Sequence, residues 1–131
     1  MPASDALLAP LAAEPRALRR EGIFALWLAV RAAEDLLVAD PPPPAAVKRR
    51  LRDLTERAES PGLPAPLRRA LPGAVALLRQ ATPEAALLAL SQLAAPAADA
   101  LGAETGALVG EIALAARRGR GVTAPAGREP R

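Results

Sequence analysis

A run of eight apolar residues, from Ile23 to Val30, most constrains how this chain folds. It lies within a segment from Pro15 to about Ala39 in which residues that favour the α-helix dominate. A helix that is apolar on every side is typically surrounded by other elements instead of lying on a surface. The pattern therefore predicts a central helix at 15–39. Its two aromatic residues, Phe24 and Trp27, are expected to pack in the core.

The apolar residues outside this run also favour helices. The chain has 34 Ala and 22 Leu but only eight Val plus Ile, and Ala and Leu lose least on entering a helix. We therefore expect no strand. Proline and glycine divide the sequence into short helical pieces. Beside the central helix, we expect helices at 5–13, 45–59, 67–80, 83–96 and from residue 97 or 103 to 118.

Several helix ends carry recognisable signals. Thr82 and Pro83 are typical of an N-cap and a first helical residue, and Ser4 is expected to cap the first helix in the same way. Pro96 is expected to kink or end the helix that begins at Pro83. The helix at 67–80 is expected to continue through Pro72 with a kink.

The length of 131 residues is that of one domain with one modest core. We predict an all-α fold, a compact four- to five-helix bundle formed by residues 1–118. Residues 119–131 consist mainly of Gly, Pro, Arg and Ala, which bury little apolar surface. We therefore expect a disordered tail there.

The residue types that the chain lacks bear on its chemistry. It contains no His, no Cys and no Tyr, so disulfides, thiolate metal sites and Glu-x-x-His di-iron motifs are excluded. Three Ser, four Thr and two Gln are few polar residues for a substrate pocket. We expect neither an enzyme nor a metal or cofactor site.

The basic residues allow two interpretations. The formal charge is only +3, although the pI is about 10.9. On α-helical spacing, Arg49 with Asp53, Arg52 with Glu56 and Asp53 with Arg57 predict a solvated face joined by weak ion pairs. Alternatively, the fold gathers eight basic residues on one face, where they would contact nucleic acid or an acidic partner. These are Lys48, Arg49, Arg52, Arg68, Arg69, Arg117, Arg118 and Arg120.

Three glycines, Gly102, Gly106 and Gly110, follow one another at a spacing of four residues. Each glycine inside a helix costs about 1 kcal/mol relative to alanine, so the repeat suggests a compensating close approach of helices. We predict a helix-packing interface there, within the bundle or between two chains. In the alternative, Gly102 only ends one helix and two of the glycines are helical.

These observations favour a non-enzymatic helical protein–protein interaction module: a homo-oligomer, an adaptor or a small subunit of a larger assembly. An alanine-rich core buries less surface per residue, so we expect a protein partner or self-association to add to its stability. The alternative is a small helical subunit of a ribonucleoprotein complex that contacts the nucleic-acid backbone through arginines. A pocket for an apolar ligand is a third option, which depends on a cavity that no sequence pattern reveals.

The sequence also bears on location. The longest uncharged run near the start, Gly22 to Val30, is far shorter than the roughly 20 residues of a membrane-spanning helix. Asp5 stands where the basic region of a signal peptide would be. We therefore expect a cytoplasmic protein with no membrane span.

Overall fold

The computed structural model describes residues 3–9, 17–38 and 44–119, and every regular element in them is helical. This confirms the predicted all-α bundle. The predicted tail lies outside the described residues from Arg120 onward, and Gly119 is the last residue of the final helix. The elements are the 3-10 helix η1 (Ala3–Leu8) and the α-helices α2 (Ala17–Val38), α3 (Pro44–Ala58), α4 (Ala65–Arg79), α5 (Pro83–Leu101) and α6 (Ala103–Gly119).

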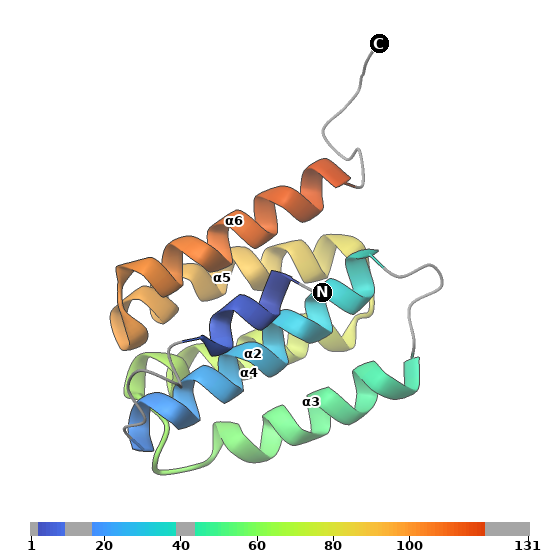
Figure 1. Cartoon of the computed structure of the whole chain (residues 1–131). Coiled ribbons are helices and arrows are strands. Elements are labelled where there is room, and N and C mark those ends of the chain that lie inside the picture. The colour runs from blue at the N-terminus through green and yellow to red at the C-terminus, as the bar shows by residue number, and fades with distance from the viewer. Residues whose placement is uncertain (1–2, 10–16, 39–43, 120–131) are drawn as a thin grey trace.

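Helix α2 is the centre of the bundle (Figure 1) and contacts each of the other five elements. Leu26, Ala29 and Val30 on this helix are completely buried. The prediction of a surrounded central helix is therefore confirmed. Its charged residues, such as Arg31 and Asp35, lie on a narrow, partly exposed stripe between the covering elements.

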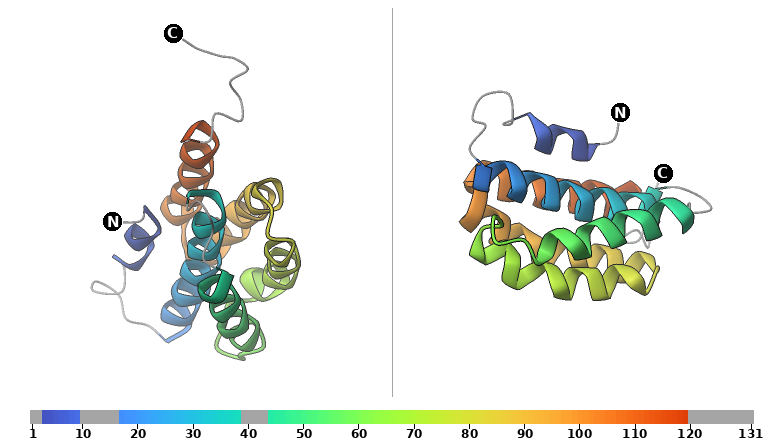
Figure 2. Two further views of the ribbon diagram at one scale, coloured as in Figure 1. Left: turned by 90° about the vertical axis from the view of Figure 1, so that its right-hand side faces the viewer. Right: turned by 90° about the horizontal axis from the view of Figure 1, so that it is seen from below.

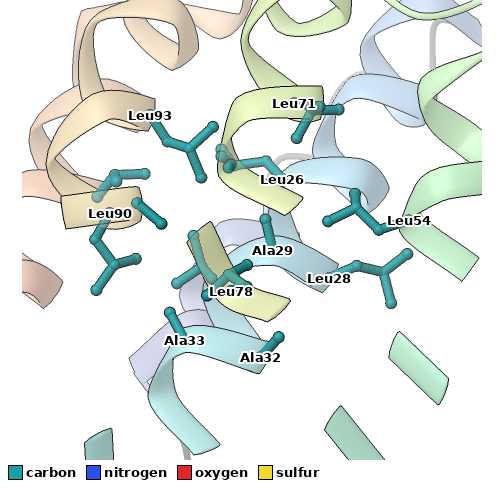
Figure 3. Packing of buried hydrophobic residues seen from close by; sticks show 14 of the residues in the cluster. Leu26, Leu28, Ala29, Ala32, Ala33, Leu54, Leu71, Leu78, Leu90 and Leu93 are labelled. Carbon is teal, nitrogen blue, oxygen red and sulfur yellow. The ribbon is translucent and has the colours of Figure 1, made fainter. Parts of the chain in front are cut away.

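The core combines alanines of α2 with leucines from its neighbours (Figure 3). Ala29 and Ala33 face this core, and both are fully buried. Their small side chains allow the neighbouring helices to approach α2 closely, and leucines fill the remaining volume. The leucines come from three helices: Leu54 of α3, Leu71 and Leu78 of α4, and Leu90 and Leu93 of α5.

The cap of α5 agrees with its sequence signal. Thr82 is the N-cap, and its hydroxyl oxygen accepts a hydrogen bond from the backbone N–H of Ala85 at 3.1 Å. Pro83 is the first helical residue, a position whose N–H makes no hydrogen bond within the helix, so the missing N–H of proline costs nothing there. Helix α6 starts at Ala103, the later of its two predicted starts.

Two prolines lie inside helices. Helix α4 continues through Pro72, as predicted, and α5 continues past Pro96 to Leu101, so of the two predicted alternatives Pro96 does not end its helix. Each proline leaves the carbonyl four residues earlier without its helical donor, and these carbonyls belong to Arg68 and Gln92. Both residues are exposed, so water can satisfy the freed carbonyls.

The first element differs from its prediction. Ser4 lies inside η1 and is completely buried, with its backbone N–H 3.4 Å from Glu34 Oε1. Its hydroxyl has no hydrogen-bond partner in the described part of the chain, so the expected capping role is wrong. The indole N–H of Trp27 donates to Asp5 Oδ1 at 3.1 Å and links η1 to α2. Trp27 packs against the core as predicted, but it is only partly buried.

Candidate protein-binding groove on α3

The position of α3 depends on its contacts with α2. Leu51 and Leu54 on its inner face are buried in the core. Arg50 forms an ion pair with Asp35 of α2, and Asp35 also pairs with Arg31 at 3.3 Å. The Asp35 side chain is only 12% exposed, so this pair is less screened by water than an ordinary surface pair.

A second charged contact lies nearer the end of α3. Arg57 Nη1 is 3.1 Å from Glu21 Oε1 of α2, and its guanidinium carbon is 5.5 Å from the centre of the Phe24 ring. The predicted pair between Asp53 and Arg57 is therefore wrong, because Arg57 reaches across to α2. Among the described residues, Arg49, Arg52 and Asp53 form no ion pair.

Beside α3 lies a groove with a volume of about 830 Å³. Leu36, Val47 and Leu51 form its apolar floor, and each is buried. The groove follows α3 from Pro44 to Glu56, about 18 Å at 1.5 Å per residue. Its α3 residues recur every three or four positions, so they share one face of the helix: Pro44, Val47, Lys48, Leu51, Arg52, Thr55 and Glu56.

The rim of the groove is mainly basic. Lys48 and Arg52 come from α3 and Arg79 from the last turn of α4, and among the described residues that line the groove Glu56 is the one acid. Arg79 Nη2 donates to Thr55 Oγ1 at 3.3 Å, and the Thr55 hydroxyl donates to the Leu51 carbonyl at 2.8 Å. The structure therefore brings two of the predicted basic residues together with Arg79, which the sequence analysis did not select.

Besides α3, the groove touches the connection between α4 and α5. Ala81, which also lines the groove, has a left-handed backbone with φ of 57°. A single alanine side chain occupies little space at this corner. No pattern in the sequence identifies such a hollow, because it depends on how α3 lies against the end of α4.

The remaining predicted basic residues lie elsewhere. Helices α3 and α6 are on opposite sides of the bundle in both figures of the whole chain (Figure 1 and Figure 2), so these residues do not form one continuous face. The exposed positions are Arg49 on α3, Arg68 and Arg69 near the start of α4, and Arg117 and Arg118 in the last turn of α6. Arg120 lies outside the described residues.

The three spaced glycines have three different surroundings. Gly102 joins α5 to α6 with φ of 110° and is not helical. A Cβ on Gly106 would lie 2.5 Å from Ala98 Cβ and 2.7 Å from the Ala94 carbonyl oxygen. A Cβ on Gly110 would meet no atom within 4 Å. Of the three glycines, Gly106 alone has a neighbour within 4 Å of the added Cβ, and α6 approaches α5 closely at that residue.

The outer surface of α5 and α6 is more acidic than that of α3. Leu114 of α6 is 51% exposed and Leu88 of α5 is 47% exposed, although both are large apolar side chains. The exposed acids on these helices are Glu84, Asp99, Glu104 and Glu111. The molecule thus presents a basic groove on α3 and exposed leucines near acids on α5 and α6.

Comparisons with known proteins identify no relative. No family model matches the chain, and neither a curated protein nor a solved structure matches it. In residues 3–9, 17–38 and 44–119, no group of three or more His, Cys, Asp or Glu side chains is arranged to hold a metal ion. No helix in this part of the chain is long and apolar enough to cross a membrane.

Proposed function

We propose that this chain is a non-enzymatic helical protein–protein interaction module that binds an amphipathic helix in the α3 groove. The observation that carries the proposal is the combination of an apolar floor with a rim of Lys48, Arg52 and Arg79. Such a module acts as a homo-oligomer, an adaptor or a small subunit of a larger assembly. Its cytoplasmic location stays a prediction.

The shape of the groove favours a helix as its occupant. The groove follows α3 for about three turns, and amphipathic helices bind such grooves through apolar residues at spacings of three and four. Leu36, Val47 and Leu51 would contact the apolar stripe of the partner. Acidic residues beside that stripe would meet the basic rim, which favours the correct partner and speeds association.

The nucleic-acid alternative requires the basic groups on one face. Because α3 and α6 lie on opposite sides of the bundle, and because Glu56 interrupts the rim, no observation specifically favours it. It remains an outcome of the test below.

Two fluorescent model peptides test the groove. Both are amphipathic helices with the same leucine stripe, and one carries glutamates where the other carries lysines beside that stripe. Fluorescence anisotropy should show that the glutamate peptide binds the wild-type protein more tightly than the lysine peptide. Arg52→Glu should weaken its binding at least about tenfold, equivalent to about 1.4 kcal/mol.

Arg49→Glu is the matched control, because Arg49 lies on the same helix and is exposed but does not line the groove. It should leave peptide binding unchanged. Equal affinity for both peptides, or equal loss in the two variants, would overturn the proposal. Binding of a DNA duplex that both variants weaken in a salt-dependent way would instead support the nucleic-acid alternative.

A further inference from the structure

One face of α6 is suited to the α3 groove. Glu104, Ala107, Glu111, Leu114 and Arg118 recur at spacings of three and four and are all exposed. We call these five residues the α6 stripe. Leu114 is its large apolar side chain, and it is 51% exposed.

We propose that the α6 stripe of a second copy of this chain occupies the α3 groove. The inference rests on the proposed function of the groove and adds the identity of the partner. Two separate observations support it: the groove has an apolar floor with a basic rim, and the α6 stripe has an exposed leucine preceded by acids. The floor would cover the exposed leucine, and the basic rim would pair with the acids.

The order of charges along the two helices also agrees. On α3, the groove carries Lys48 and Arg52 first and Glu56 last. On α6, Glu111 comes before Arg118. If the helices run in parallel, Glu111 lies beside the basic pair while Arg118 lies beside Glu56. Lys48 to Glu56 spans about 12 Å of helix and Glu111 to Arg118 about 10.5 Å, so both charge pairs fit one alignment.

Two other segments of the same chain fit the groove less well. The sequence after α6 contains Arg120, Arg128 and Arg131 with one acid, Glu129, so its charge has the same sign as the rim. The first element, η1, already packs on α2 and α6. A second copy therefore supplies the complementary segment.

The positions of the two surfaces determine the kind of assembly. Because α3 and α6 are on opposite sides of the bundle, a copy bound through its α6 stripe leaves its own groove free (Figure 2). Such head-to-tail contacts join different surfaces and extend into an open chain or a ring. The contact area of one helix face is small, so association should be weak and depend on protein concentration.

Charge reversal on the two surfaces tests this pairing. The variants are Arg52→Glu in the groove and Glu111→Arg in the α6 stripe, each measured alone and in an equimolar mixture by sedimentation velocity. The wild type should show a mean mass that rises with concentration and falls in high salt. Each variant alone should remain monomeric, because like charges then face each other.

The equimolar mixture should associate again. In it, the groove of the Arg52→Glu variant meets the stripe of the Glu111→Arg variant, and the unchanged groove of the second variant meets the unchanged stripe of the first. Arg49→Glu and Asp99→Arg are controls that reverse exposed charges outside both surfaces, and they should associate like the wild type. Circular dichroism and Trp27 fluorescence should show that every variant is folded.

Three results would overturn the pairing: a wild type that is monomeric at all concentrations, loss of association in only one of the two variants, or a mixture that does not recover. If the glutamate peptide binds the groove while the wild type stays monomeric, the proposed function survives and the second copy is not its partner. If the wild type associates but the peptides do not discriminate, the basic rim does not select the partner and both proposals fail.

Discussion

The helix pair α5 and α6 and the helix pair α2 and α3 are joined in different ways. At Gly106, α6 approaches α5 so closely that an added Cβ would lie 2.5 Å from Ala98. Helix α3 is instead joined to α2 by buried leucines together with long arginine side chains that reach Asp35 and Glu21. Close backbone contact leaves no space beside Gly106, whereas long side chains join helices without closing the groove beside α3.

The largest expected effect concerns the apolar part of the α2–α3 contact. Leu54→Ala should lower the free energy of unfolding by about 2–5 kcal/mol, because it leaves a cavity at a fully buried position. Urea denaturation followed by Trp27 fluorescence measures it. A loss smaller than that caused by removing the Asp35 charge would show that ion pairs, not leucines, hold α3 in place.

The next effect tests the close contact of α5 and α6. Gly106→Ala should lower stability by about 1–3 kcal/mol, because the new Cβ overlaps the Ala94 carbonyl and Ala98. Gly110→Ala is the control in the same helix, and it should raise stability by about 0.5–1 kcal/mol because its Cβ enters open space. Thermal unfolding by circular dichroism should show opposite shifts in Tm. Equal shifts would mean that the helices separate easily at Gly106.

Removing the charge of Asp35 should have a smaller effect. Asp35→Asn should cost about 1–2 kcal/mol, because Arg50 and Arg31 lose their shared, largely buried partner. A double-mutant cycle with Arg50→Met isolates the contribution of that pair. If the double variant loses as much stability as the two single variants together, the Arg50–Asp35 pair contributes nothing to the stability of the fold.

The smallest effect is expected at the outer end of the same contact. Arg57→Met should lower stability by only about 0.5 kcal/mol, because the Arg57 and Glu21 side chains are 39% and 35% exposed and water screens them. Most of this loss should disappear in high salt. A loss as large as that of Asp35→Asn, unaffected by salt, would indicate that the contact with Phe24 dominates.

Local signals predicted the elements well. The all-apolar run at Ile23–Val30 indicated the central helix, and Thr82 with Pro83 indicated the start of α5, because both features act within a few residues. Pro96 allowed either a kink or a helix end, and the choice between them depends on whether water reaches the carbonyl of Gln92. The position of that carbonyl in the fold is not encoded in the neighbouring residues.

The candidate site was predicted only in part. Lys48 and Arg52 were selected for their charge, but Arg79 and Ala81 were not, since they reach the groove only when α4 packs beside α3. Likewise, the i,i+4 rule assigned Arg57 to Asp53, whereas the folded chain offers it Glu21 on another helix. Contacts between elements depend on packing that local spacing does not describe.

The central position of α2 has a consequence for synthesis on the ribosome. This helix is completed before α4 and α5, although both cover it in the finished bundle. Until Pro83–Leu101 has been translated, the part of the α2 surface that α5 covers in the bundle has no partner in the nascent chain. Such surfaces promote aggregation and chaperone binding. The apolar α2 surface is therefore incompletely covered between the translation of α2 and that of α5.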